Sequence, residues 1–196
     1  MIRLTLKALP FAIAALVSVP AHAVSGTFAC ISSAADCTAA TGNNVTWSYV
    51  GNVFTIASTG PAAFFVGDVY FDFLSTTAVS FSGGAGTSYS SPATPPALPG
   101  GNAYTIGAAG WASSWSAGSP PATNGINSGE SASWTFASTD YVAGIHLQGL
   151  TAVGGGSTSA SLIAVPTVTA VPEPETYALM LAGLGAVGWV ARRRRG

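Results

Sequence analysis

Hydrophobic and polar residues alternate through most of the middle of this chain. Val69, Phe71 and Phe73 fall on one side of an extended strand, with Tyr70 and Asp72 on the other. A period of two is typical of strands that turn one face to a core and one to water. Short runs of this character end at Gly, Asn, Ser or Pro. We predict strands at residues 45–50, 53–58, 63–74, 78–82, 103–106, 131–137, 141–150 and 159–165.

These strands are expected to form one domain over residues 24–170. Gly51-Asn52, between the first two strands, is a hairpin signal. Residues 88–101 and 118–129 contain several prolines and are predicted to be long exposed loops. Helical periodicity is confined to the two ends of the chain. The pattern therefore predicts an all-β fold, a single β-sandwich or jelly-roll-like domain.

The first 23 residues have a different character. Arg3 and Lys7 form a basic region, residues 8–19 are apolar, and Ala21-His22-Ala23 places small residues on either side of one position. This order predicts a secretory signal peptide over residues 1–23 that is helical and is cleaved after Ala23. The Sec export machinery and signal peptidase are the partners it requires.

The last 26 residues, 171–196, form a second targeting segment with three parts. They are a proline-containing motif at 171–176, an apolar stretch at 177–191, and a basic tail at 192–196. The prolines keep the motif extended, lipid requires the apolar stretch to be helical, and the arginines remain on the cytoplasmic side. At about 1.5 Å per residue that helix spans roughly 22 Å, less than a ~30 Å hydrocarbon core, which suits a transient transmembrane anchor. The motif residues are Val171, Pro172, Glu173 and Pro174, and the stop residues are Arg192, Arg193, Arg194 and Arg195.

This order of motif, helix and arginines resembles the PEP-CTERM sorting signal of exopolysaccharide-producing Gram-negative bacteria. The resemblance implies recognition by exosortase, a membrane-embedded transpeptidase-like enzyme. It also implies a brief stay in the inner membrane, followed by transfer to the cell surface or the extracellular matrix. An ordinary single-pass tail anchor is the alternative interpretation.

Charge separates the targeting segments from the domain. Every lysine and arginine lies at residues 3, 7 or 192–195, so residues 24–170 contain none. The same residues contain five acids, and five negative charges with no positive ones give a formal charge of about −5. The acids are Asp36, Asp68, Asp72, Glu130 and Asp140. A protein without basic residues cannot neutralise phosphates, which excludes nucleic acid as a partner.

Cys30 and Cys37 are the only cysteines, and in an exported protein they are expected to form a disulfide that closes a small loop. A metal site would need two further ligands, whereas the domain contains one histidine, His146. A redox pair would more typically show Cys-x-x-Cys spacing. We therefore predict a structural disulfide and no metal site.

Catalytic chemistry finds little support in the sequence. His146 lies on a predicted strand with Gln148 on the same face, which favours an exposed or loop-bound histidine over a general base. Asp68 and Asp72 share a strand face at roughly 13 Å, beyond the ~5–9.5 Å separation of glycosidase carboxylates. Solvated acids are the simpler interpretation, and calcium binding by loop carboxylates is the alternative. We predict no catalytic residues, no cofactor and no enzymatic activity.

Aromatic residues give the remaining functional signal. Trp47 and Trp134 lie on predicted strands and are expected in the core. Trp111 and Trp115 lie between the two proline-containing loops and are candidates for stacking on sugar rings. The sequence therefore predicts a non-enzymatic surface or matrix protein of the biofilm with a structural or adhesive role. The alternative is a carbohydrate-binding module for the cell's own exopolysaccharide.

Overall fold

The structure is a computed structural model, and it describes residues 23–60, 64–75, 77–107, 110–166, 180–185 and 191–193. The chain divides into two compact units. One unit comprises His22–Ala170, and the other comprises Met1–Ala21 together with Val171–Gly196. All the named strands lie within the first unit, so this unit is a domain with its own core.

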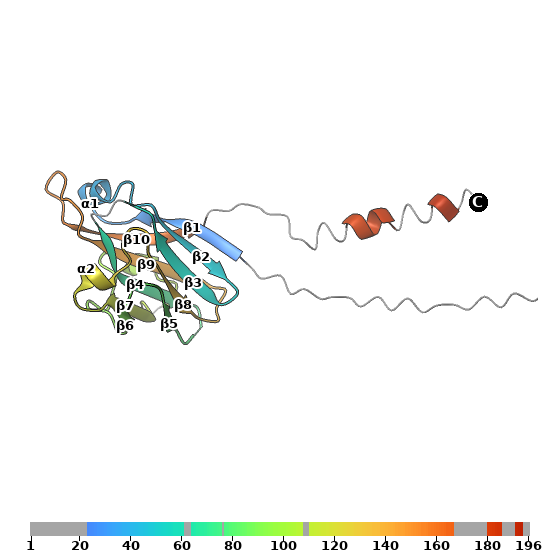
Figure 1. Ribbon diagram of the computed structural model, residues 1–196, viewed down its shortest axis with the longest axis horizontal. Helices are drawn as coiled ribbons and strands as arrows, with labels where there is room; N and C mark the ends of the chain where they lie inside the picture. Colours follow the sequence, from blue (N-terminus) through green and yellow to red (C-terminus); the bar gives the residue numbers. More distant parts are fainter. Residues whose placement is uncertain are drawn as a thin grey trace, which may run out of the picture. The chain divides into compact units, whose positions relative to one another are not determined.

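The domain is built on one antiparallel sheet of ten strands, in the order β5-β8-β3-β2-β1-β10-β9-β4-β7-β6 (Figure 1). The strands are β1 (Ala23–Cys30), β2 (Val45–Val50), β3 (Val53–Ser58), β4 (Phe65–Phe73), β5 (Ser80–Gly83), β6 (Tyr89–Ser90), β7 (Ser113–Ala117), β8 (Ser131–Thr135), β9 (Tyr141–Gln148) and β10 (Ser159–Pro166). Short helices occur at α1 (Ala34–Ala39), η1 (Asn102–Tyr104) and α2 (Pro121–Asn124).

The sheet folds over so that its two halves face each other across one core. Phe54 of β3 meets Phe71 of β4 edge-on, with ring centroids 5.3 Å apart. Phe81 of β5, at one end of the sheet, packs against Tyr89 of β6, at the other end, with centroids 5.6 Å apart. The prediction of an all-β fold is confirmed, and the fold is a single, nearly closed sheet rather than two separate ones.

Large side chains from both halves fill the core. Phe54, Ile56 and Trp134 have no exposed surface. Burial of a large apolar side chain contributes about 1.5–3 kcal/mol, so this core is the main source of stability. Trp47 and Trp134 belong to this core, as predicted.

The hairpin of β2 and β3 follows the local sequence closely. Both strands have the predicted bounds, and Val50 pairs with Val53 across Gly51-Asn52. Gly51 adopts a φ of 64°, a conformation that glycine reaches without steric cost. Local periodicity and turn chemistry therefore suffice to predict this part of the sheet.

Other elements depart from the predictions. Residues 102–104 form the 3₁₀ helix η1 where a strand was expected, and the pattern misses β1, β6 and β7. In β7 one large side chain, Trp115, stands among serines, so no alternation is visible. Helix was expected only at the chain ends, yet α1 and α2 lie within the domain. The Ser33 hydroxyl accepts the Asp36 N–H at the start of α1.

The outer face of β4 is buried, contrary to the expectation that it faces water. Tyr70 and Asp72 have exposed fractions of 0% and 1%. Ala93 and Leu98, from the proline-containing stretch predicted to be an exposed loop, pack with Tyr70 and Ile163 into a second apolar cluster. The Tyr70 hydroxyl also donates to the Pro95 carbonyl at 3.0 Å. The loop therefore covers one side of the sheet.

In the second unit, residues 180–185 and 191–193 are helical. Among the residues that the structure describes, no helix combines the length and apolar character needed to cross a membrane. The predicted signal helix lies outside the described residues, apart from its last position, Ala23. The predicted transmembrane helix at 177–191 lies only partly within them.

Candidate functional site

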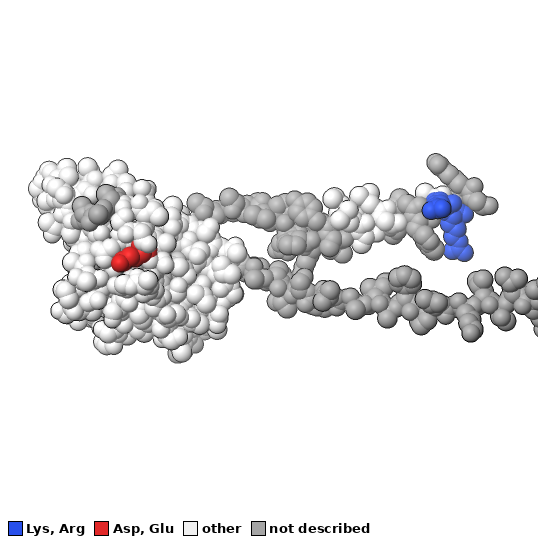
Figure 2. Space-filling view, viewed as in Figure 1, with Lys and Arg blue, Asp and Glu red and all other residues white. Residues whose placement is uncertain are grey.

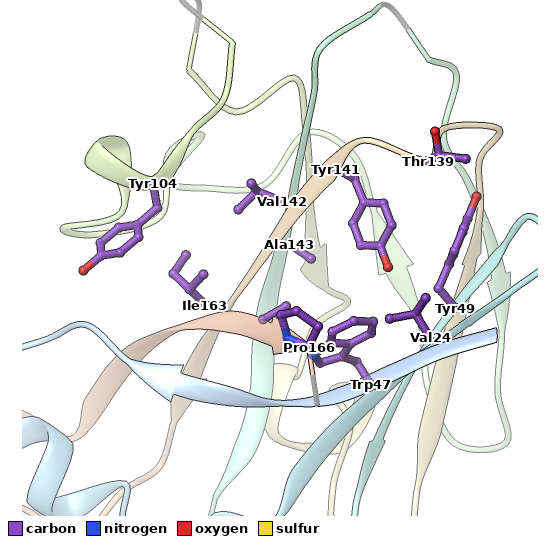
Figure 3. A pocket seen from close by; sticks show the side chains of 11 residues that line it. Val24, Trp47, Tyr49, Tyr104, Thr139, Tyr141, Val142, Ala143, Ile163 and Pro166 are labelled. Atoms are coloured by element: carbon purple, nitrogen blue, oxygen red, sulfur yellow. The ribbon is translucent and has the colours of Figure 1, made fainter. Parts of the chain in front are cut away.

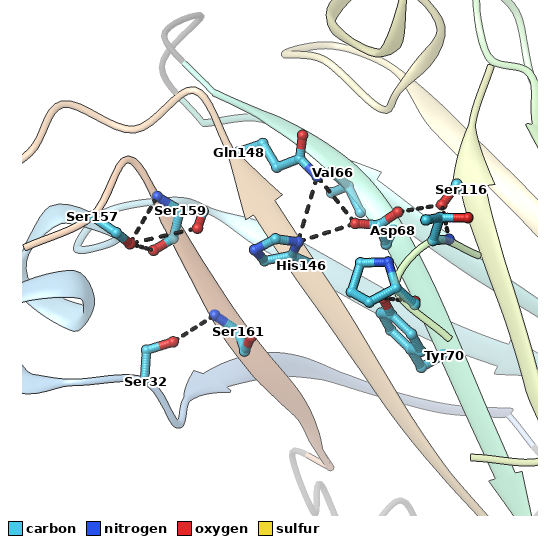
Figure 4. A network of polar contacts seen from close by, with 12 residues as sticks. Ser32, Val66, Asp68, Tyr70, Ser116, His146, Gln148, Ser157, Ser159 and Ser161 are labelled. Carbon is cyan, nitrogen blue, oxygen red and sulfur yellow. Dashed lines mark hydrogen bonds and ion pairs between the residues drawn. The ribbon is translucent and has the colours of Figure 1, made fainter. Parts of the chain in front are cut away.

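Four polar side chains lie together across strands β7, β4 and β9. Asp68 of β4 pairs with Ser116 on one side and with His146 on the other. Its carboxylate accepts a hydrogen bond from the Ser116 hydroxyl and is joined to His146 Nδ1 at 3.0 Å (Figure 4). Gln148 Nε2 donates to the same carboxylate oxygen at 3.0 Å. We call these four residues the Asp68 network.

Asp68 is buried, and the other three members of the Asp68 network are partly buried. Asp68 is 3% exposed, and the His146 side chain is 14% exposed. The expectations of a solvated Asp68 and of an exposed or loop-bound His146 are therefore wrong. A carboxylate can be buried in this way because its charge is met by several donors.

The order of the groups in this network differs from that of a hydrolytic triad. Ser116 bonds to the carboxylate, whereas a nucleophilic serine bonds to the imidazole. The Ser116 hydroxyl oxygen also accepts the Thr94 N–H at 3.1 Å, so it fixes the covering loop. In this geometry the network holds three strands and a loop together, and among the described residues no hydrogen bond joins the imidazole to a serine.

Asp72 has a separate set of partners. Its Oδ2 accepts the backbone N–H groups of Ile106 and Gly107, both at 2.6 Å. Asp68 and Asp72 share a strand face, as predicted, but each binds its own neighbours. Asp72 anchors the segment that follows η1, within the stretch where a strand was predicted at residues 103–106.

The two remaining acids with hydrogen-bonded carboxylates, Glu130 and Asp36, also hold backbone segments in place. Glu130 accepts the Asn127 N–H at 2.8 Å and the Asn127 side-chain amide at 3.1 Å, within the turn before β8. Asp36 accepts the Ser33 hydroxyl and the Ser157 N–H, which lower the pKa of its carboxyl. Within the described residues no group of three or more His, Cys, Asp or Glu side chains could hold a metal ion.

Cys30 and Cys37 form the predicted disulfide. It joins the end of β1 to α1 across a sequence separation of 7 residues. Because Asp36 bonds to Ser157, the turn between β9 and β10 is also joined to α1. The disulfide and the Asp36–Ser157 hydrogen bond thus hold β1, α1 and the turn between β9 and β10 together.

Trp111 and Trp115 lie in different apolar clusters. Trp111 packs against Tyr70 in the outer cluster, with ring centroids 5.8 Å apart. Trp115 packs against Phe81 at 6.2 Å, on the side of the main core, and its indole N–H donates to Ser113. Both are only partly buried, but the structure does not bring them together as one stacking surface. Sugar binding by either residue stays a prediction.

An apolar groove of about 470 Å³ opens beside β1, β9 and β10 (Figure 3). Its lining consists of Val24, Trp47, Tyr49, Tyr104, Thr139, Tyr141, Val142, Ala143, Ile163, Ala164 and Pro166. Burial raises the pKa values of the Tyr49 and Tyr141 phenols. No local sequence pattern marks this groove, because its walls come from segments that are distant in the chain.

Comparison with known families identifies the C-terminal segment. Residues 170–195 match the family model of the PEP-CTERM protein-sorting motif. The chain therefore carries a PEP-CTERM sorting motif, and this motif indicates an exported protein that is targeted to an exosortase by a membrane-anchored sorting route. No curated protein and no solved structure shows a significant match to the chain.

The sorting residues lie mostly outside the described part of the chain. Arg192 and Arg193 are described, within a short helical segment. Ala23, the residue before the predicted signal-cleavage point, is the first residue of β1 and pairs with Val50. The residues outside the described ranges are Ala21, Val171, Pro172, Glu173, Pro174, Arg194 and Arg195.

Proposed function

We propose that the exported domain is a non-enzymatic protein of the cell surface or extracellular matrix, with a structural or adhesive role beside the exopolysaccharide of a biofilm. The observation that carries this proposal is that the buried and partly buried acidic side chains make hydrogen bonds within the domain. The carboxylates of Asp36, Asp68, Asp72 and Glu130 all accept hydrogen bonds from neighbouring segments of the domain. Groups that could transfer protons in an enzyme are here engaged in holding strands and loops.

The surface composition supports the same role. Residues 24–170 contain no lysine or arginine, and the face of the domain in Figure 2 shows one red area and no blue. Hydration therefore depends largely on serine, threonine, asparagine and backbone groups. Such a surface has little electrostatic attraction for acidic polymers, so any adhesion must use apolar or hydrogen-bonding contacts.

A test of this proposal follows the protein through a host that has an exosortase. A tag inside the domain reports its distribution among inner membrane, cell surface, matrix and medium. We expect the parent protein to lose its tail and reach the surface or the matrix. Replacement of Pro172, Glu173 and Pro174 by alanine keeps the helix and arginines but removes the recognition element. This variant should accumulate uncleaved in the inner membrane.

Two outcomes would contradict parts of this proposal, one its sorting motif and the other its matrix role. Processing of the alanine variant like the parent would make the Pro-Glu-Pro motif incidental. Recovery of the processed parent only in the medium, with no surface or matrix fraction, would refute the matrix role but leave the sorting route intact.

Carbohydrate binding is tested separately on purified exopolysaccharide. Trp111→Ala and Trp115→Ala are measured one at a time, because the two residues belong to different clusters. Loss of binding in one variant would replace the structural role with a carbohydrate-binding module. Retention of the protein in the matrix without measurable affinity for the polysaccharide would favour the structural role.

A further inference from the structure

The apolar groove lies where two neighbouring strands separate. The pairing of β9 with β10 ends at Gly144 and Ile163. Beyond this point Tyr141–Ala143 pair with β4, whereas Ala164–Pro166 pair with β1. Residues from both separated ends line the groove. The groove is thus a wedge between two strand edges.

Backbone groups of both edges face this wedge. The Ser161 carbonyl accepts the Ile31 N–H on the β1 side of β10, and successive residues of a strand alternate in direction. The Pro166 carbonyl therefore points toward β9. Leu162, the residue after Ser161, faces β9 by the same alternation and pairs there with Ile145. Ile145 therefore directs its N–H and carbonyl toward β10, and so does Tyr141, four residues earlier. Strand edges with open donors and acceptors are templates for a further strand.

The walls of the groove restrict what such a strand can be. Trp47 and Tyr141 pack edge to face at 6.3 Å, and the other walls are mainly aliphatic. None of the lining residues is charged. An added strand must therefore carry uncharged side chains, with at least one apolar residue turned toward the aromatic wall.

We propose that the groove binds residues 167–171 of a second copy of this chain as an added strand. These residues read Thr-Val-Thr-Ala-Val, and they directly follow Pro166, which lines the groove. They are uncharged and rich in β-branched side chains, which favour strands. The segment thus has the composition that the groove requires, and it leaves the domain at the groove itself.

Turn chemistry indicates a second copy as the source of the strand. To enter its own groove, the chain would have to reverse immediately after Pro166, through Thr167-Val168. Two-residue hairpin turns need positive φ values, which glycine and asparagine adopt and β-branched residues avoid. Insertion into another copy needs no reversal. The contact joins two different surfaces, so each copy offers both a segment and a groove.

The first experiment compares two protein chains by sedimentation velocity across a dilution series. Chain 24–171 carries the segment, and chain 24–166 lacks it. Both retain all ten strands, apart from Ala23 at the start of β1, and both apolar clusters. We expect 24–171 to self-associate and 24–166 to remain monomeric. A monomeric 24–171, or equal association of the two chains, would overturn the proposal.

Point variants and a peptide locate the contact. Val168→Glu in chain 24–171 should abolish association, whereas Val153→Glu, at a position that is 42% exposed in the turn between β9 and β10, should not. A synthetic peptide of residues 167–171 added to chain 24–166 should shift the amide resonances of Tyr141–Ala143 and of Ala164 and Val165. Association that survives Val168→Glu, or peptide shifts confined to other strands, would refute this location.

Discussion

The phenol of Tyr89 offers a sharp test of how the segment around Ile126 is held to β4. Tyr89 lies on β6 and is 7% exposed, with its ring against Trp134 at 5.2 Å. Its hydroxyl donates to the Val66 carbonyl and accepts the Ile126 N–H at 3.2 Å. Tyr89→Phe keeps the ring and removes only these two hydrogen bonds.

The expected cost follows from the groups left behind. Val66 and Ile126 remain bonded to each other, with the Ile126 N–H 3.4 Å from the Val66 carbonyl, so neither loses every partner. We expect Tyr89→Phe to lower the free energy of unfolding by about 1–3 kcal/mol at pH 8.

The difference in unfolding free energy between the parent and Tyr89→Phe should become smaller at alkaline pH. Burial, the largest cause, raises the pKa of the Tyr89 phenol well above its ordinary value of 10.0. Above pH 10 the unfolded chain therefore loses this proton while the folded chain keeps it. The contribution of the Tyr89 phenol to the parent's free energy of unfolding is fully present below pH 10. Above pH 10 this contribution falls by about 1.4 kcal/mol per pH unit. The phenylalanine variant lacks this group, so by about pH 11 the gap should have narrowed by about 1.4 kcal/mol.

Urea unfolding followed by tryptophan fluorescence at pH 8, 10 and 11 measures both quantities. Tyr70 and Tyr141 are present in both proteins, so their titration cancels in the comparison. Tyr104→Phe is the matched control because Tyr104 is 46% exposed, and at pH 8 its effect should stay within about 0.5 kcal/mol. A gap between parent and Tyr89→Phe that is the same at pH 8 and pH 11 would refute the reasoning.

Three further predictions concern the disulfide and the buried carboxylates that join separate segments of the domain. Replacing Cys30 and Cys37 by serine should lower the free energy of unfolding by at most roughly 2–3 kcal/mol and leave the β-type circular dichroism spectrum unchanged; two reactive thiols in the purified parent would disprove the disulfide. Asp68→Ala should cost about 3 kcal/mol in chemical unfolding, because three donors lose their acceptor, while exposed Asp140→Ala should cost less than about 0.5 kcal/mol. Asp72→Ala should accelerate amide hydrogen exchange at residues 106 and 107, and unchanged exchange there would exclude Asp72 as their anchor.

Local chemistry explains which parts of the fold could be predicted. The β2–β3 hairpin has a period of two on both sides of a Gly-Asn turn, and its bounds match the structure. The sorting signal is contiguous in sequence, and its match to a family follows the same residues. In both cases the information lies within a short stretch of chain.

The Asp68 network and the groove depend on contacts that the sequence does not encode locally. Ser116 is 48 residues from Asp68, and His146 is 78 residues from it, so their meeting depends on strand order. The outer face of β4 looked polar because its apolar cover, including Leu98, comes from a loop whose prolines indicated exposure. Composition shows which residues can be covered, and only the topology shows what covers them.

The absence of lysine and arginine from the domain also determines how the protein can be detected. Between Lys7 and Arg192 trypsin has no cleavage site, so residues 8–192 would leave a digest as one large peptide. After signal cleavage, the only primary amine of the domain is its new N-terminus, so amine-directed labels and cross-linkers would modify it there alone. Routine tryptic proteomics of a matrix would therefore overlook this protein even where it is abundant. Cleavage at aromatic residues, or intact-mass measurement, is the way to find it.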